Sequence, residues 1–492
     1  MTQAGDLLLV LDAGTTSTRA MAFDPAGRVL AMAQRELTQY YPQAGWVEHD
    51  ASEIWRETLA CAQQVCAKLG GPARFAAIGI SNQRETVVAW DKRTLQPLHH
   101  AIVWQDRRTA DQCAALREAD HEQMVQDRTG LLLDPYFSAT KMQWLLANVP
   151  AVADAAVAGR LTFGTVESWL VAQLTGGLQV TDATNASRTS LLPLCGAGWD
   201  SGLCDLFGVP VEALGEVIDC YGDFGTSLPE LLGGPIRIAG LAGDQQAATI
   251  GQACLAPGET KATYGTGAFV LSNTGTTVPR SRNRLLSTVL SQIGGKRAYA
   301  LEGSVFVAGS LVKWLRDSLG LISHAAETES LARSVADSGG VVIVPALSGL
   351  GAPHWRPDAR AAISGMSFAT GRAHVARAAL EAMALQTRDL ADAFAADGAE
   401  WRNLRIDGGM SANDWMAQDI ADILDLPVSR PKMVETTALG AAMLAATGAG
   451  LHSDLGTAAN AMRGPDTTFE PMLEAATRAE RIAAWNVALS RI

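Results

Sequence analysis

The stretch Asp12-Ala13-Gly14-Thr15-Thr16-Ser17-Thr18-Arg19 decides the fold expected for this 492-residue chain. It follows five apolar residues, 7–11, which have the composition of a buried strand. A glycine and a series of hydroxyl side chains directly after such a strand favour a tight turn whose N–H and O–H groups converge on an anion. Arg19 adds a fixed cation on the next strand. The stretch therefore predicts a strand-turn-strand hairpin that holds phosphate groups, with Asp12 placed to bind Mg²⁺ beside them.

A second hairpin of the same kind is expected at Tyr264-Gly265-Thr266-Gly267, between short strands over residues 261–264 and 268–273. A third element, Asp407-Gly408-Gly409 with Asn413 four residues on, lies between an expected strand and an expected helix. Its glycines would let an adenosine approach the backbone closely. Neither a Walker A sequence nor G-x-G-x-x-G occurs, so P-loop and Rossmann folds lack support.

The two similar hairpins, far apart in the chain, suggest an internal duplication. Single hydrophobic cores stop growing near about 250–300 residues, so a chain of this length is expected to form two domains. We place the boundary near Gly251, which gives domains of residues 1–251 and 252–492. The expected fold class is α/β, with one hairpin starting each half.

Local patterns predict further elements. Asp50 and Glu53 form a capping-box pattern that opens a helix. Helical spacing assigns the buried face of that helix to Trp55, Leu59, Ala62 and Cys66. Strands are also expected over residues 18–23, 29–35, 75–81 and 404–406, helices over about 304–319 and 375–395, and a helical tail from about residue 458.

Composition excludes several classes of partner. The net charge of −12 and the pI near 5.2 argue against nucleic acid or an anionic membrane surface, since both need a basic face. The seven cysteines show no paired spacing and are expected to be reduced thiols of a cytosolic protein. No apolar run approaches the ~20 residues of a membrane span, and no signal-peptide pattern precedes the first strand. We therefore expect a cytoplasmic protein.

Seven further motifs, in order along the chain, are more specific. They resemble the glycerol kinases of the FGGY family, within the sugar kinase, hexokinase and actin superfamily, and the resemblance runs from about residue 7 to 445, nearly nine-tenths of the chain. The motifs are Gly45-Trp46-Val47-Glu48-His49-Asp50, Asn82-Gln83-Arg84-Glu85-Thr86, Ile102-Val103-Trp104-Gln105, Asp134-Pro135-Tyr136-Phe137-Ser138, Thr184-Asn185-Ala186-Ser187-Arg188-Thr189, Ala242-Gly243-Asp244-Gln245-Gln246 and Gly349-Leu350-Gly351-Ala352-Pro353.

The resemblance implies two actin-like (ribonuclease H-like) domains with the active site in the cleft between them. It implies transfer of a phosphoryl group from Mg-ATP to glycerol, giving sn-glycerol 3-phosphate, in a homo-oligomer (dimer or tetramer). A first alternative is an FGGY kinase for another small polyol or ketose, such as a tetritol or a pentulose. A second is an actin-like nucleotide-binding sensor without turnover. The presence of both Asp12 and Asp244 argues against the sensor, because a binder needs no base.

The resemblance also implies roles for individual residues. Asp244 would be the general base and, with Asp12, would position Mg²⁺. The residues implied to contact the polyol are Arg84, Glu85, Trp104, Tyr136, Asp244, Gln245 and Phe269. The residues implied to contact ATP or ADP are Thr15, Thr16, Ser17, Arg19, Thr266, Gly309, Lys313, Gly409 and Asn413.

Among the positions that depart from the family pattern are Ala13, Lys313 and Pro235. Most glycerol kinases have Gln at the position of Ala13, so the polyol site is open to enlargement there. Lys313 replaces a common Gln near the nucleotide, which alters the contacts available to it. Pro235 interrupts the glycine-rich segment that some members use to bind a sugar bisphosphate inhibitor. Because proline lacks an N–H donor, we do not expect that regulation here.

Overall fold

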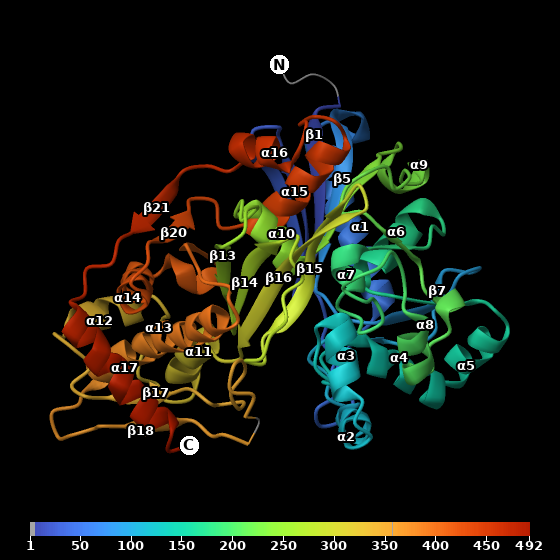
Figure 1. The fold of residues 1–492 in the computed structure, drawn as a ribbon. Coiled ribbons are helices and arrows are strands. Elements are labelled where there is room, and N and C mark those ends of the chain that lie inside the picture. The colour runs from blue at the N-terminus through green and yellow to red at the C-terminus, as the bar shows by residue number, and fades with distance from the viewer. Residues whose placement is uncertain (1–4, 357) are drawn as a thin grey trace.

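The computed structural model describes residues 5–356 and 358–492, so Met1–Ala4, at the start of the expected first domain, lie outside the described residues. Two lobes lie side by side, each built on its own mixed sheet (Figure 1). The first sheet has the order β12-β5-β1-β2-β3. Its strands are β1 (Leu7–Ala13), β2 (Ser17–Phe23), β3 (Val29–Glu36), β5 (Phe75–Asn82) and β12 (Ile238–Gly243).

The second sheet has the order β15-β16-β14-β13-β19-β20-β21. Its strands are β13 (Glu259–Tyr264), β14 (Ala268–Gly275), β15 (Leu286–Ile293), β16 (Lys296–Val305), β19 (Asn403–Asp407), β20 (Val428–Pro431) and β21 (Asp466–Phe469). In both sheets two antiparallel strands form a hairpin, β1–β2 or β13–β14. The first strand of each hairpin pairs in parallel with a later strand, β5 or β19, and that strand pairs in parallel with a further one, β12 or β20. The prediction of an α/β protein with two similar halves is therefore confirmed.

Helices cover these sheets and form the outer parts of both lobes (Figure 1). The first half contains α1 (Ala51–Lys68), α2 (Ala110–Glu118), α3 (Glu122–Thr129), α4 (Ser138–Asn148), α5 (Pro150–Val157), α6 (Val166–Thr175), α7 (Ala183–Ala186), α8 (Ser201–Phe207), α9 (Pro229–Leu232) and α10 (Asp244–Gly251). The second half contains α11 (Gly309–Asp317), α12 (Glu327–Arg333), α13 (Arg372–Ala396), α14 (Asp414–Leu424), α15 (Thr436–Gly448), α16 (Leu455–Met462) and α17 (Ala475–Leu489).

The remaining strands are short and pair outside the two large sheets. They are β4 (Glu48–His49), β6 (Val88–Asp91), β7 (Gln96–Pro97), β8 (Ala101–Ile102), β9 (Leu161–Gly164), β10 (Val180–Asp182), β11 (Glu216–Ile218), β17 (Val342–Val344) and β18 (Ala362–Ser364).

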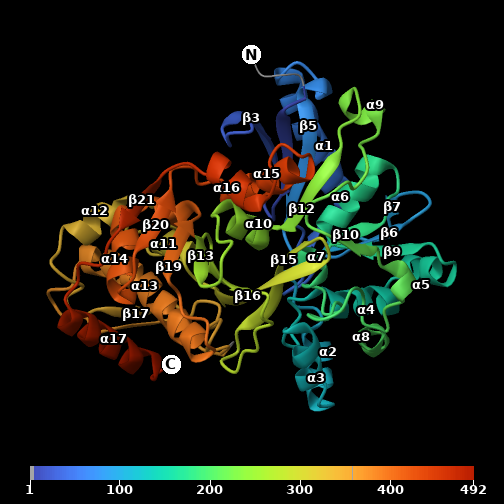
Figure 2. The same cartoon turned by 45° about the horizontal axis from the view of Figure 1, so that its top comes forward.

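Helix α15 joins the two halves. It belongs to the second half in sequence, but it packs against β1, β5 and β12 of the first sheet and against α10 (Figures 1 and 2). The approach is close because glycines lie at the contacts: a Cβ on Gly79 would meet the Ala441 carbonyl at 2.4 Å, and one on Gly440 would meet the Ala247 carbonyl at 1.8 Å. The two lobes therefore share a buried helix pair beside the first sheet.

Three local predictions were wrong in detail. The helix expected from residue 304 begins only at Gly309, because Ser304 still pairs with Phe269 in the antiparallel ladder of β16 and β14. The C-terminal tail is not helical throughout, since β21 separates α16 from α17 and extends the second sheet. Asp50 caps α1 by accepting from the Ser52 N–H at 2.8 Å, but the Glu53 carboxylate accepts from Thr38 instead of completing a capping box.

The buried face of α1 was assigned only in part. Ala62 and Cys66 are buried as expected, whereas Trp55 and Leu59 are half-buried. The fully buried positions on the same face include Ile54 and Cys61. All seven cysteines are free thiols, and six of them are buried. In the described parts of the chain no helix is both long and apolar enough to cross a membrane.

Candidate active site

The first hairpin turns as predicted, at the end of β1. The Gly14 N–H donates to the Ser17 carbonyl at 3.0 Å and closes the turn. Beneath it, the Gln83 side-chain amide donates to the Gly14 carbonyl at 3.0 Å and to His49 Nδ1 at 3.2 Å. Burial lowers the pKa of His49 to about 4, so the turn is supported by an uncharged ring.

The charged residues of this hairpin pair with one another. Arg19 Nη2 lies 2.6 Å from Asp12 Oδ2, and its Nη1 lies 2.5 Å from Glu435 Oε2 in the loop before α15. Burial raises the pKa of Asp12 although Arg19 opposes that shift. Both residues predicted to serve Mg-ATP at this hairpin are thus held together, with Arg19 half-buried between two carboxylates.

The second hairpin is packed through its backbone. The turn N–H of Gly265 donates to the Gly267 carbonyl at 2.9 Å, and the Gly309 N–H at the start of α11 donates to the Gly265 carbonyl at 2.9 Å. A Cβ on Gly309 would lie 2.5 Å from that carbonyl oxygen, so glycine is required by space alone. Thr266 is exposed beside Gly309, and Lys313 is exposed one turn further along α11.

The third glycine-rich element follows β19. Gly408 has φ +85°, and a Cβ there would lie 2.5 Å from the Tyr264 carbonyl, which brings this element against the second hairpin. Around Gly409 nothing lies within 4 Å of the position of a Cβ. Asn413 caps α14 by accepting from the Met416 N–H at 2.9 Å, and its amide donates to Thr328. Its side chain therefore has a structural role of its own.

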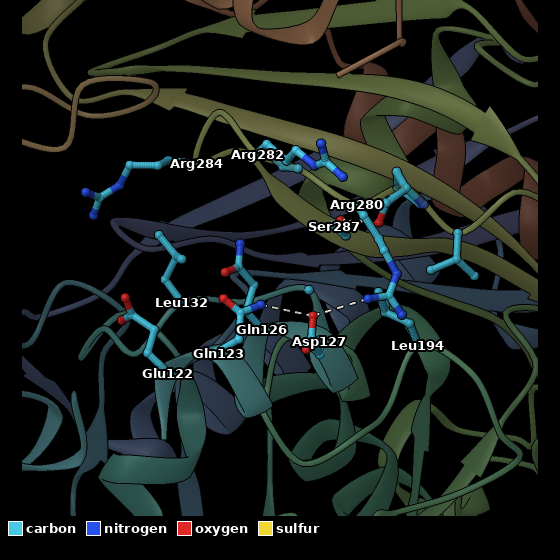
Figure 3. Close-up of a pocket in the computed structure, with 14 residues that line it drawn as sticks. Glu122, Gln123, Gln126, Asp127, Leu132, Leu194, Arg280, Arg282, Arg284 and Ser287 are labelled. Carbon is cyan, nitrogen blue, oxygen red and sulfur yellow. Dashed lines mark hydrogen bonds and ion pairs between the residues drawn. The ribbon is translucent and has the colours of Figure 1, made fainter. Parts of the chain in front are cut away.

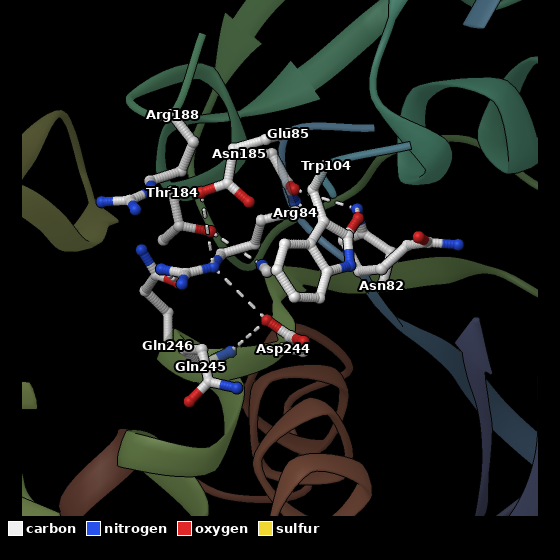
Figure 4. Close-up of polar contacts among 12 residues, drawn as sticks. Asn82, Arg84, Glu85, Trp104, Thr184, Asn185, Arg188, Asp244, Gln245 and Gln246 are labelled. Carbon is white, nitrogen blue, oxygen red and sulfur yellow. Dashed lines mark hydrogen bonds and ion pairs between the residues drawn. The ribbon is translucent and has the colours of Figure 1, made fainter. Parts of the chain in front are cut away.

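The residues implied to contact the polyol meet around Arg84, at the end of β5. Arg84 Nε lies 3.4 Å from Asp244 Oδ1, and the two side chains face each other (Figure 4). Arg84 Nη2 donates to the Tyr136 hydroxyl at 3.3 Å. Glu85 is buried next to Arg84 with φ +60°, a backbone conformation uncommon for residues other than glycine.

Three aromatic rings line the same region. Trp104 stands edge-on to Tyr136, with ring centroids 5.7 Å apart, and edge-on to Phe269 at 6.3 Å. The Trp104 indole N–H donates to the Thr15 hydroxyl at 2.9 Å. This bond connects the aromatic rings to the first hairpin.

Asp244 is the first residue of α10, directly after β12. Its carboxylate accepts from the Gln245 N–H at 2.7 Å, and 32% of its side chain is exposed. Desolvation by the surrounding protein raises the pKa of Asp244, the charges of Arg84 and Lys261 oppose this, and the nearby Asp12 carboxylate adds to it. The side chain thus combines access to solvent with an environment that favours taking up a proton.

Asp12 and Asp244 are close enough to influence each other's charge, and both offer carboxylate oxygens. Among residues 5–356 and 358–492 no group of three or more His, Cys, Asp or Glu side chains could hold a metal ion. Mg²⁺ usually keeps several waters and takes only one or two protein carboxylates together with substrate phosphates. The donor set present therefore fits an Mg²⁺ ion that binds together with nucleotide.

Three buried charged residues at the site were given no role from the sequence: Arg188, Lys261 and Glu302. Arg188 lies within a motif quoted for the family resemblance. Lys261 donates to the Gln245 side-chain carbonyl and, at 2.9 Å, to Thr263. Glu302 accepts from Arg84 and from Arg188. A charged residue with uncharged residues on both sides within a strand, as at 261 and 302, was the available signal.

A separate cavity of about 480 Å³ lies between the lobes, and it contains none of the predicted site residues (Figure 3). It is bounded by α3 and by the loop that precedes β15. One ion pair, between Arg280 and Asp127 at 3.2 Å, crosses it, and both side chains are at least half exposed.

Comparison with known proteins places this geometry in a family. The N-terminal domain of the FGGY family of carbohydrate kinases matches residues 7–251, and its C-terminal domain matches residues 260–449. A glycerol kinase of Rhodospirillum centenum is 54% identical over 487 residues, covering 98% of this chain and 97% of the relative. A glycerol kinase of Alcanivorax borkumensis is 53% identical over 488 residues, covering 99% and 98%.

A solved structure is also similar to this chain over nearly its whole length. Plasmodium falciparum glycerol kinase with ADP superposes with a TM-score of 0.93 at 36% identity, covering 99% of this chain and 98% of that one. The two family matches together include most of the chain and contain both hairpins and the residues around Arg84 and Asp244. This chain belongs to the FGGY family of carbohydrate kinases.

Proposed function

We propose that this chain transfers the terminal phosphoryl group of ATP to glycerol and forms sn-glycerol 3-phosphate. Two lines of evidence support the proposal. Relatives that share more than half of its residues over nearly its whole length are glycerol kinases. The observation that carries it is that Arg84 lies 3.3 Å from the Tyr136 hydroxyl and 3.4 Å from the Asp244 carboxylate, beside the rings of Trp104 and Phe269.

The polyol would be oriented by groups of complementary character. Arg84 donates to hydroxyl oxygens, whereas Glu85 and the side-chain carbonyl of Gln245 accept from hydroxyl protons. The edges and faces of Trp104 and Phe269 would contact the carbon chain. Holding the substrate in this way lowers the entropic cost of bringing its reacting hydroxyl to the phosphate.

Asp244 would accept the proton of the attacking hydroxyl. A general base works best when its pKa approaches the working pH, and burial raises the pKa of Asp244 in that direction. The proton passes from the hydroxyl oxygen to the Asp244 carboxylate as that oxygen forms its bond to phosphorus, while the bond from this phosphorus to the bridging oxygen of ATP breaks and ADP leaves. In phosphoryl transfer most of the remaining catalysis is positioning and charge stabilisation.

The nucleotide would bind across both hairpins. Thr15, Thr16, Ser17 and Arg19 come from the first, Thr266, Gly309 and Lys313 from the second hairpin and α11, and Gly409 and Asn413 from the third element. Asp12 and Asp244 would hold Mg²⁺, which neutralises charge on the phosphates when it is bound. For Arg19 to reach a phosphate it must exchange its contact with Asp12 or Glu435.

The experiment is an assay of ADP release with Mg-ATP and a panel of alcohols. Buried polar groups left unpaired by a missing hydroxyl can reduce kcat/KM by ~10⁴-fold or more, so propane-1,2-diol and propane-1,3-diol should be poor substrates. Erythritol and a pentulose test whether Ala13 enlarges the site. If either gave a higher kcat/KM than glycerol, the proposed substrate would be wrong while phosphoryl transfer stood. Absence of ADP release with every alcohol would favour the sensor.

We further propose a cytoplasmic homo-oligomer, a dimer or tetramer. The free thiols of all seven cysteines are in keeping with a reducing compartment. Sedimentation analysis of the full chain would test the assembly, and a monomer at micromolar concentration would contradict it.

A further inference from the structure

Four buried charged side chains form a closed network beside Asp244. Arg84 Nη1 and Nη2 donate to the two oxygens of Glu302 at 2.7 and 2.9 Å. Arg188 donates from Nη2 to Glu302 at 3.2 Å and from Nε to Glu85 at 2.6 Å. The side chains of all four are at most 2% exposed. Two cations and two anions therefore balance one another away from solvent.

The members of this network come from different lobes. Arg84 and Glu85 follow β5, and Arg188 follows α7, all in the first half. Glu302 alone comes from the second half, in the middle of β16, where it lies opposite Leu271 in the ladder with β14. A carboxylate in the interior of a sheet is costly unless it is paired, so its position requires both arginines.

Glu302 competes with Asp244 for the same arginine. Arg84 makes two short bonds to Glu302, whereas its contact with Asp244 is a single one from Nε at 3.4 Å. A paired guanidinium and carboxylate prefer parallel, two-bond geometry. If Glu302 lost its charge, Arg84 would be free to form such a two-bond ion pair with Asp244. The candidate base would then be held in an ion pair, and Arg84 would no longer present its donors to a polyol.

We propose that Glu302 is a positioning residue of the polyol site: from the second lobe it holds the Arg84 guanidinium in a two-bond pair, so that Arg84 does not form such a pair with Asp244 and presents its remaining donors to the polyol. Through Arg188 it also fixes Glu85. The inference rests on the proposed function, because it gives Arg84, Glu85 and Asp244 the roles described above. It adds that the second lobe contributes a charged side chain to the polyol site as well as residues for the nucleotide.

The test compares Glu302→Gln with Glu302→Asp and with a matched control, Glu381→Gln. Glu381 is a buried glutamate of α13 that pairs with Arg377 at 3.0 Å, away from the site. For Glu302→Gln we expect the KM for glycerol to rise about tenfold or more and kcat to fall, because removing one partner of a buried hydrogen-bonded charge pair is costly. The KM for ATP should stay within about twofold, since ATP contacts lie elsewhere.

Two further readouts separate positioning from a loss of structure. Glu302→Asp keeps the charge and should recover part of the affinity for glycerol, whereas Glu381→Gln should leave both KM values unchanged. An unchanged KM for glycerol in Glu302→Gln, or an equal rise in both KM values, would overturn the proposal. Should Glu302→Gln fail to fold, Glu302→Asp is judged by the same criterion, with a smaller rise expected.

The wild-type assay distinguishes this failure from failure of the proposed function. If wild-type protein phosphorylates glycerol and the Glu302 variants keep its KM, the positioning role alone is wrong. If the wild type prefers another polyol, the substrate proposal is wrong. The same variants are then compared with that polyol and judged by the same ratio of KM values.

Discussion

The two halves of the molecule share a strand topology but contribute to the candidate site in different ways. The first half supplies mainly charged and aromatic side chains: Arg84 contacts Asp244, and Trp104 contacts Tyr136. The second half supplies mainly glycine backbone, at Gly265, Gly309, Gly408 and Gly409. Its hairpin is packed so closely against α11 that a Cβ on Gly309 has no room. Duplicated strands thus provide reactive groups on one side and a close-fitting backbone surface on the other.

Removing the candidate base tests most strongly whether the first half supplies the reactive groups. Asp244→Asn should lower kcat by about 10²–10⁴, the range for a lost acid–base group, with a smaller change in KM. The measurement is steady-state kinetics with glycerol and Mg-ATP. A variant that kept more than about a tenth of the wild-type kcat would remove Asp244 from this role.

The backbone surface of the second half can be tested with a matched pair of glycines. Gly409→Ala should leave stability unchanged, because nothing lies within 4 Å of the added Cβ, yet raise the KM for ATP about tenfold if the nucleotide packs there. Gly309→Ala should instead destabilise the protein by about 1–3 kcal/mol, because its Cβ meets a carbonyl oxygen at 2.5 Å.

Stability is measured by thermal unfolding, and the KM for ATP is measured from initial rates at increasing ATP concentration. A wild-type KM for ATP in Gly409→Ala would place the nucleotide away from this backbone. Unchanged stability in Gly309→Ala would show that the hairpin and α11 can move apart.

The last expected effect concerns support of the first hairpin, and it depends on pH. The pKa of His49 is about 4 in the folded protein, against 6.5 for an unperturbed histidine. Between these values the unfolded chain binds a proton that the folded chain does not, so stability present above pH 6.5 is lost as pH falls towards 4. The loss corresponds to about 3 kcal/mol.

Chemical denaturation of wild type and His49→Gln across this range measures the difference. The loss should appear in wild type and be absent from the variant, which cannot titrate. His324→Gln, at an exposed position, is the control and should follow wild type. Parallel curves for wild type and His49→Gln would contradict a buried neutral imidazole beneath the Gly14 turn.

Much of the site could be predicted because the chemistry and the local backbone demand the same residues. Tight turns after buried strands need glycine, so both hairpins and the element at 407–409 were visible in the sequence. The seven residues expected around the polyol do gather in one region, although their individual roles stay predictions. The sequence did not reveal that Arg19 pairs with Asp12 and Glu435, and its contact with phosphate stays a prediction.

By itself, the sequence determined the fold class, the two hairpins and the set of residues that meet around Arg84, because these follow from local patterns and from motifs that resemble a known family. Only the tertiary structure decided which buried charges pair. Glu302 and Arg84 are 218 residues apart, and α15 packs on the sheet of the other half. Such partners are selected by the low dielectric of the interior, where each charge must find its opposite, and no local pattern records that choice.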